Sequence, residues 1–209
     1  MSRPRQHVVK QGEHLAKIAD AHGVAPDLIW DHPANRQLRE LDRSPGVLAP
    51  GDVLTIPAPP TAPLALRART HNAFEANVAR VSVRVQLQGD DGPLANAPYV
   101  LEGVGALKEG RTDGEGYLEE QVPADVERLR VVLTEHHQVI PLRVGHLDPV
   151  STESGVSQRL KHLGLVGEGD PREDAVREGV AAFQHRAGLD PSGVVDEATR
   201  EALRRAHGS

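Results

Sequence analysis

Four prolines within residues 57–64 constrain the fold of this chain more than any other feature of its sequence. Proline has a fixed φ angle and no backbone N–H, so such a run interrupts helices and the interior of sheets. It favours extended polyproline II backbone, which acts as a semi-rigid spacer between domains. We therefore place a domain boundary here and expect three small modules, at residues 1–60, 61–148 and 149–209.

The first module has the pattern of a small βααβ fold. Short β-prone runs at residues 7–10 and 53–56 stand at its two ends. Between them, Leu15, Ile18 and Ala19 recur at spacings i, i+3 and i+4, which places them on one face of a helix. A second helical run follows after a glycine and a proline. The predicted order is therefore strand, helix, helix, strand.

The middle module has a strand pattern throughout. Residues 80–88 alternate strictly between apolar and polar side chains, which is typical of a strand with one buried face. Further short apolar runs follow, separated by turn signals such as residues 113–116, Asp-Gly-Glu-Gly. Several short strands joined by turns predict a small all-β sandwich that spaces the two ends of the chain.

The last module has a helical period. After a polar hinge at residues 146–154, Val156, Leu160 and Leu163 fit one apolar stripe of a helix. Asp196 precedes another helical run in the position of an N-cap residue. These features predict a three-helix bundle, so that the whole chain is a multidomain α+β protein.

Composition excludes several classes of partner. The formal net charge is -6, and no segment has the basic excess that nucleic acid or an anionic membrane would require. The chain contains no cysteine, which excludes disulfides and thiolate nucleophiles. No run approaches the roughly 18 apolar residues of a membrane span. The first ten residues lack the apolar stretch of a signal peptide, so we expect synthesis in the cytoplasm and export by a non-Sec route.

The sequence predicts no catalytic residues, no metal site and no cofactor. Residues 136–137 are adjacent histidines, which would point to opposite faces of a strand. Glu119 and Glu120 are an available carboxylate pair, but strand alternation would separate them, and we interpret them as a solvated strand edge. A further hypothesis is that the protein is an enzyme with an unrecognised site in residues 64–145.

The first module resembles a LysM domain. The runs that carry the resemblance are Val8–Leu15, Ile18–Ala19, His22–Val24 and Pro50–Pro57. A departure is Glu13–His14, where the family usually has Asp-Thr or Asp-Ser. The resemblance implies a shallow groove for N-acetylglucosamine between the loop after the first strand and the loop before the second. The residues that would form this groove are Gly12, Glu13, His14 and Leu15, facing Gly46, Val47, Leu48 and Ala49. Alternatively, Leu15 and Leu48 belong only to the core.

The last module resembles the peptidoglycan-binding domain 1 family. The runs that carry the resemblance are Gly155–Leu165, Ala181–Leu189 and Ser192–Leu203. The family's central Asp-Gly-x-x-Gly loop is replaced by residues 166–171, Val-Gly-Glu-Gly-Asp-Pro. The resemblance implies a second glycan-binding surface, for which the candidate residues are Leu165, Phe183, Gln184 and Leu189.

Two wall-binding modules in one chain predict a non-catalytic peptidoglycan-binding protein that acts at the cell wall or in the periplasm after its non-Sec export. Joining two weak sites raises their effective concentration, so that avidity exceeds either affinity by about 10²–10⁴ when both can be engaged. An alternative rests on residues 31–35, Asp-His-Pro-Ala-Asn, which are similar to a LysM subgroup often found with type VI secretion and other contractile injection spikes. That resemblance implies an accessory or adaptor protein that docks to a spike or toxin and guides its delivery through the cell wall.

Overall fold

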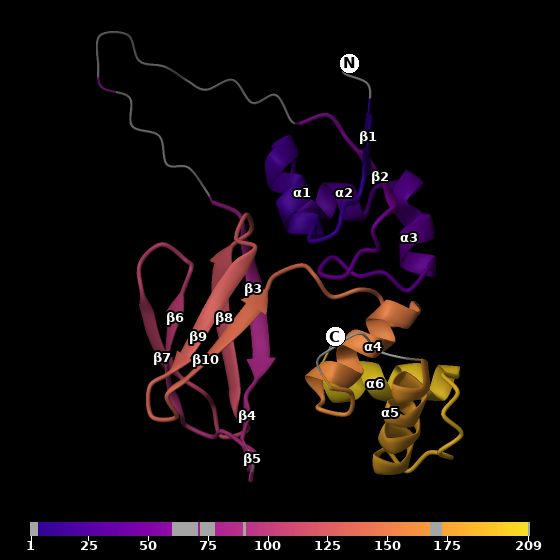
Figure 1. Ribbon diagram of the computed structural model, residues 1–209. Coiled ribbons are helices and arrows are strands. Elements are labelled where there is room, and N and C mark those ends of the chain that lie inside the picture. The colour runs from indigo at the N-terminus through magenta and orange to yellow at the C-terminus, as the bar shows by residue number, and fades with distance from the viewer. Residues whose placement is uncertain (1–3, 60–70, 72–77, 90, 168–172, 209) are drawn as a thin grey trace.

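The computed structural model describes residues 4–59, 71, 78–89, 91–167 and 173–208 (Figure 1). Within these ranges the protein is mixed α and β, as predicted, with helices in its first and last parts and strands in its middle part. Most of the proline-rich stretch, residues 60–64, lies outside the described residues, and residues 57–59 have no regular secondary structure. Among the helices in the described ranges, none has the length and apolar character needed to cross a membrane.

The N-terminal module pairs its first strand with its last strand across a group of short helices. Its elements are β1 (Arg5–Val8), α1 (Leu15–His22), α2 (Pro26–Trp30), the 3₁₀ helix η1 (Pro33–Asn35), α3 (Arg36–Glu40) and β2 (Val53–Ile56). Strands β1 and β2 are antiparallel, with Val8 opposite Val53. The predicted order of strand, helix, helix, strand is present, with two further short helices before β2.

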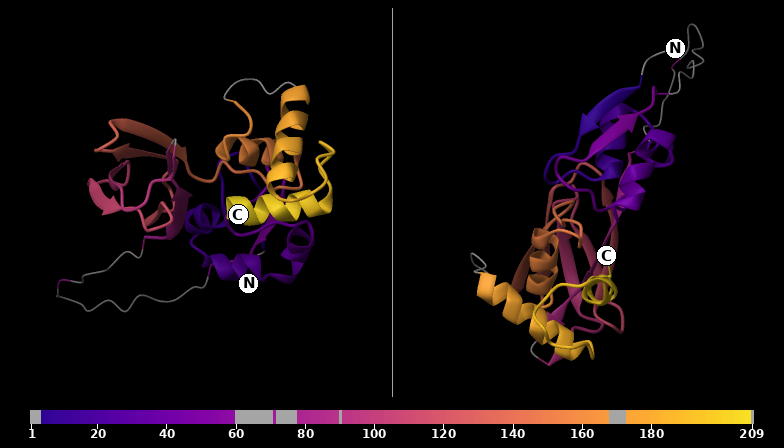
Figure 2. Two further views of the ribbon diagram at one scale, coloured as in Figure 1. Left: turned by 90° about the horizontal axis from the view of Figure 1, so that it is seen from below. Right: turned by 90° about the vertical axis from the view of Figure 1, so that its right-hand side faces the viewer.

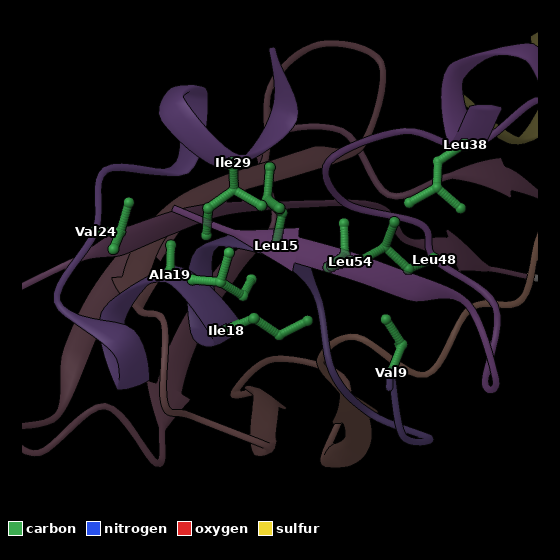
Figure 3. Packing of buried hydrophobic residues seen from close by; sticks show 10 residues of the cluster. Val9, Leu15, Ile18, Ala19, Val24, Ile29, Leu38, Leu48 and Leu54 are labelled. Atoms are coloured by element: carbon green, nitrogen blue, oxygen red, sulfur yellow. The ribbon is translucent and has the colours of Figure 1, made fainter. Parts of the chain in front are cut away.

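Helix α1 supplies much of the core of this module. The helix begins after His14, whose imidazole Nδ1 accepts a backbone N–H of the first turn, and it ends at Gly23 with a left-handed φ of 63°. Leu15, Ile18 and Ala19 are at most 1% exposed and lie in one cluster with aliphatic residues of the other elements (Figure 3). The predicted helix face is therefore confirmed.

A buried asparagine joins the helices to the second strand. The Asn35 side-chain amide donates to the carbonyls of Ile29 and Thr55, at 2.7 and 2.9 Å, and its oxygen accepts the Thr55 N–H at 2.7 Å. Because an unpaired buried amide is costly, this arrangement fixes β2 against the end of α2. Trp30, the only tryptophan, packs partly buried against the same core.

The middle of the chain forms three antiparallel sheets. The strands are β3 (Arg80–Gln86), β4 (Gln88–Gly89), β5 (Gly92–Pro93), β6 (Pro98–Glu102), β7 (Lys108–Arg111), β8 (Tyr117–Pro123), β9 (Arg128–Leu133) and β10 (Gln138–Arg143). Their order is β10-β9-β6-β7 in a four-stranded sheet, with β3-β8 and β4-β5 as separate pairs. Leu101 and Val131 of the larger sheet share one core with Leu118 and Val122 of β8. The strand predicted over residues 80–88 is interrupted at Leu87, which is buried.

Two expectations for this region differ from the structure. Glu119 is exposed and Glu120 is buried, so the predicted separation of the pair is confirmed, but the solvated-edge interpretation is wrong for Glu120. The Glu120 carboxylate accepts the Tyr99 hydroxyl at 2.9 Å and is paired with Lys108. Burial and this carboxylate raise the pKa of Tyr99. The histidines at 136–137 lie in the turn between β9 and β10 rather than in a strand.

The C-terminal module consists of α4 (Glu153–His162), α5 (Glu173–Arg186) and α6 (Glu197–His207). Asp196 caps α6 as predicted, because its carboxylate accepts both the N–H and the hydroxyl of Thr199, at 2.8 and 2.6 Å. These hydrogen bonds hold the pKa of Asp196 below its usual value. Leu160 and Leu203, both fully buried, lie at the centre of the helical core.

The three parts of the molecule are in contact with one another. Figures 1 and 2 show the strands and the C-terminal helices side by side, with the N-terminal module across one end of both. The segment predicted to be a hinge, residues 146–154, is tied on both sides. The Gln158 amide donates to the His146 carbonyl at 3.1 Å, and the Gln11 amide donates to Asp148 at 3.3 Å. The first residues of this segment are therefore hydrogen-bonded to both neighbouring modules.

Candidate functional site

An apolar pocket opens on the C-terminal module between the ends of its three helices. Its volume is about 450 Å³. The residues that line it are Leu163, Leu165, Phe183, Arg186, Ala187, Ala202, Arg205 and Ala206. This volume is in the range of ordinary small-molecule sites, which combine an apolar lining with a few polar groups.

The same spacing on two helices builds the walls of the pocket. Helix α5 contributes Phe183 and, at i+3, Arg186, and the residue at i+4, Ala187, follows directly after the end of the helix. Helix α6 contributes Ala202 with the residues at i+3 and i+4, which are again an arginine and an alanine. Residues at these spacings are neighbours on one helix face. Each helix therefore presents a buried apolar residue, a small residue and a guanidinium to the pocket.

The end of α4 completes the pocket through a glycine turn. Gly164 has a φ of 69°, a backbone conformation that glycine adopts without strain. Its N–H donates to the Lys161 carbonyl at 3.0 Å, and the next N–H, of Leu165, donates to the Leu160 carbonyl at 2.8 Å. Such bonds close the C-terminus of a helix. The turn places Leu163 and Leu165 in the pocket wall.

The two arginines are the only charged residues in this lining. Phe183 and Ala202 are 5% and 9% exposed and form the floor, whereas Arg186 and Arg205 are exposed at the rim. The ion pair of Arg205 with Glu201 is long, with 3.9 Å between Nε and the carboxylate oxygen. A positively charged rim over an apolar floor suits a ligand that carries a carboxylate beside small apolar groups.

Two histidines are sequence neighbours of pocket residues: His162 precedes Leu163 and His207 follows Ala206. The rings of His162 and His207 are stacked, with centroids 5.1 Å apart and 2.8 Å between Nδ1 of the first and Nε2 of the second. Burial, aided by the charges of His162 and Arg159, lowers the pKa of His207 to about 4, and burial likewise lowers that of His162. Both rings are uncharged at neutral pH, so the positive charge near the pocket stays with the arginines. Nowhere in the described ranges do three or more histidine or acidic side chains gather into a group that could hold a metal.

The four residues predicted for this module divide into two groups. Leu165 and Phe183 line the pocket, whereas Gln184 is 1% exposed and Leu189 packs against the helical core. The Gln184 amide donates to the Val194 carbonyl at 2.8 Å and accepts from the backbone N–H of the preceding glycine. Gln184 therefore holds the loop before α6 and does not line the pocket. Sequence reasoning missed the two arginines, although the repeated helical spacing was available to reveal them.

The groove predicted on the N-terminal module is largely covered. Leu15 and Leu48 belong to the core cluster, Ala49 is 9% exposed, and the two loops are joined by a hydrogen bond from the Leu15 N–H to the Pro45 carbonyl. Gly46 is exposed and Val47 is half-buried. Two of the eight predicted residues are therefore core, as the alternative interpretation held, and they cannot touch a sugar in this conformation.

The remaining predicted residues have partners within the protein. Burial raises the pKa of Glu13, but hydrogen bonds from His7, at 2.7 Å, and from the Lys10 N–H, at 2.9 Å, bring it below its usual value. His14 is 2% exposed, and burial lowers its pKa. Gly12 is also buried. The loop that a glycan would approach is thus occupied by contacts of the protein itself.

Comparison with known families finds a similarity in the C-terminal module. Residues 156–203 match the family model described as "Putative peptidoglycan binding domain". The N-terminal module gives no match to the LysM family model. No curated protein and no solved structure gives a significant match to the chain. The part of the molecule that holds the pocket is therefore the part similar to a peptidoglycan-binding family, and this similarity indicates peptidoglycan as its partner.

Proposed function

We propose that this protein binds peptidoglycan without cleaving it, and that the pocket of the C-terminal module is its principal site. The observation that carries the proposal is the position of the pocket. Six of its eight lining residues fall within residues 156–203, which match the peptidoglycan-binding family, and the other two follow on the same helix, α6.

The charge of the pocket favours the peptide stem over the glycan. The sugars of peptidoglycan present amides, methyl groups and hydroxyls, whereas its stems carry alanyl methyl groups and free carboxylates. Arg186 and Arg205 at the rim can donate paired hydrogen bonds to a carboxylate, and the alanine and leucine walls can accept a methyl group. We therefore propose a stem-peptide carboxylate as the group that enters the pocket.

The N-terminal module is proposed as a second wall-binding module. Its support is the βααβ order and the LysM resemblance of its first and last runs. Two modules on one chain would act by avidity, provided that both sites are accessible on one wall fragment. Because Gly12 and His14 are buried in the free protein, this second module would contribute the smaller share of binding.

The proposal that the protein does not cleave its ligand rests on how the carboxylates are used. Glu120 is engaged by Tyr99 and Lys108 inside the β-rich region, and Glu119 lies on the opposite face of the strand. An acid and a base for glycoside hydrolysis must face one cleft from its two sides. This pair does not have that arrangement.

Co-sedimentation with purified sacculi tests the principal proposal. We expect the double variant Arg186→Gln/Arg205→Gln to bind about tenfold or more weakly than the wild type, because it loses two charge-assisted contacts. Sacculi stripped of stem peptides by an amidase should bind the wild type as weakly as intact sacculi bind the variant.

Arg177→Gln is the matched control, because Arg177 is an exposed arginine of α5 that does not line the pocket. Equal binding by the control and the double variant would contradict the assignment of the pocket. Undiminished binding to stem-free glycan would contradict the assignment of the stem. Release of soluble muropeptides into the supernatant would contradict the non-catalytic function.

A further inference from the structure

The segment between β10 and α4 touches all three parts of the molecule. We refer to residues 144–148 as the connecting segment. Its side facing the N-terminal module meets the loop after β1. The Gln11 amide donates to the His146 carbonyl at 3.5 Å and to the Asp148 carboxylate at 3.3 Å. The connecting segment thus lies along the loop that the LysM resemblance marks as a glycan site.

Two glycines allow this close approach. A Cβ atom added to Gly12 would lie 2.9 Å from Nε2 of His146, and one added to Gly145 would lie 2.8 Å from the Gly12 carbonyl oxygen. The second of these would also lie 3.0 Å from the His14 ring. Both glycines have left-handed φ values, of 84° and 75°. The His146 ring and the Gly145 backbone therefore cover Gly12.

The other side of the connecting segment is fixed to α4. The Gln158 side chain accepts the Asp148 N–H at 2.7 Å and donates to the His146 carbonyl at 3.1 Å. The buried Arg159 guanidinium donates to the Asp148 carbonyl at 2.8 Å. Hydrogen bonds of this kind, made by a charged and buried group, are among the stronger ones. The segment therefore belongs to the C-terminal module and presents His146 to the N-terminal one.

Polar contacts flank this cover on both sides. Lys17 of α1 pairs with Glu127 of the β-rich region at 2.6 Å. Asp42 pairs with Arg204 of α6, and Arg43 donates to the Ser151 hydroxyl at 3.1 Å. Exposed ion pairs each contribute little to stability and are weakened by salt. These polar contacts therefore add little to the stability of the boundary between the modules.

We propose that the connecting segment is a latch that covers the loop at residues 11–15 and keeps the N-terminal module from binding the wall until the latch is released. This inference rests on the proposed wall-binding function of the N-terminal module. The latched and released states are in equilibrium. A glycan strand that binds only the released loop shifts this equilibrium towards the released state, to an extent set by the affinity of the glycan for the loop. The apparent affinity of the N-terminal module is reduced by the small released fraction.

The test uses a charge-reversal cycle in the full chain. Lys17→Glu and Glu127→Lys are made singly and together, all in the Arg186→Gln/Arg205→Gln background, so that the remaining wall binding comes from the N-terminal module. We expect each single reversal to release hydrogen-exchange protection at residues 11–15 and 144–148 and to increase binding to sacculi about two- to tenfold. The double reversal should restore both protection and weak binding. Arg36→Glu reverses the charge of an exposed residue of α3 that pairs with Glu40 of the same helix, and it should change neither.

A second variant tests the cover directly. Gly145→Ala places a methyl group against the Gly12 carbonyl, whereas Gly105→Ala puts the same residue at a left-handed φ with nothing within 4 Å. Only the first should increase binding. Released exchange without increased binding would overturn the latch, and so would unchanged exchange in every variant. A wrong assignment of the pocket would be recognised separately. In that case the Arg186→Gln/Arg205→Gln variant, without any change at the latch, would bind sacculi as the wild type does.

Discussion

The N-terminal and C-terminal modules were assigned to wall binding by the same reasoning, but the structure treats their predicted sites differently. In the C-terminal module, Leu165 and Phe183 line an open pocket with two arginines at its rim. In the N-terminal module, Gly12 and His14 are buried beneath residues 145–146. The difference teaches that a family motif predicts the module, whereas the accessibility of its surface depends on which other segment packs there.

In both modules the most recognisable motif residues serve the fold. Leu15 fills the core of the N-terminal module, and Gln184 of the Phe-Gln pair holds the loop before α6. The pocket instead depends on Arg186 and Arg205, which stand one turn along their helices from the apolar floor. A comparison of stability with binding therefore separates motif residues that build the module from residues that meet a ligand.

The largest effect is expected at Leu15. Replacement by alanine should lower the free energy of unfolding of the N-terminal module by about 2–5 kcal/mol, because it leaves a cavity at a site that is 1% exposed. Urea denaturation followed by Trp30 fluorescence measures this, since the only tryptophan lies in that module. Val47→Ala, at a half-buried loop position, is the control and should cost less than about 1 kcal/mol. A Leu15→Ala variant with an unchanged transition would restore Leu15 as a groove residue.

Gln184 should give the next largest effect. Gln184→Ala leaves the Gly193 N–H and the Val194 carbonyl without their partner, at a cost of about 1–3 kcal/mol. Thermal unfolding followed by circular dichroism would detect the loss. The exposed neighbour His185, replaced by alanine, should unfold as the wild type does. If Gln184→Ala were instead fully stable but failed to bind sacculi, Gln184 would be a ligand contact.

Acidification should weaken the C-terminal module through His207. Burial lowers its pKa in the folded state to about 4, below the ordinary value of about 6.5, so the unfolded chain binds the proton first as the pH falls. The stabilisation is present above about pH 6.5 and is lost towards pH 4, by about 1–2 kcal/mol. Urea denaturation at several pH values should give a steeper decline for the wild type than for His207→Asn. Parallel pH profiles would show that His207 titrates equally in both states.

The smallest effect is expected at the ion pair between Asp42 and Arg204, which joins the two modules. A double-mutant cycle with alanine at both positions should give a coupling energy of about 0–1 kcal/mol that declines with added salt. Arg204 also pairs with Glu201 in its own helix, so the cycle is needed to isolate the contact between modules. A coupling that salt does not change would argue against a boundary that opens easily.

Local features of the sequence were predicted well because they depend on neighbours in the chain. Asp196 caps α6 and Gly23 ends α1, as their positions indicated. The alternation at residues 80–88 gave a strand as far as Gln86. Caps, helix faces and strand alternation follow from backbone geometry within a few residues.

Features that depend on distant segments were missed. Glu120 is buried because Tyr99 and Lys108, on other strands, supply its partners. The segment predicted as a hinge is tied down by Gln11 and Gln158, which lie on either side of it in the chain. No local pattern reveals either pairing.

By itself, the sequence determined that this chain has a βααβ module, a strand-rich middle and a helical module similar to a peptidoglycan-binding family, because propensity, periodicity and motif spacing are local properties. Only the tertiary structure decided which of the predicted surfaces are open. Gly12 is covered because Gly145 and His146, more than 130 positions away, pack against it. The pocket is open because two helices place alanines where larger side chains would have filled the space between Phe183 and the arginine rim.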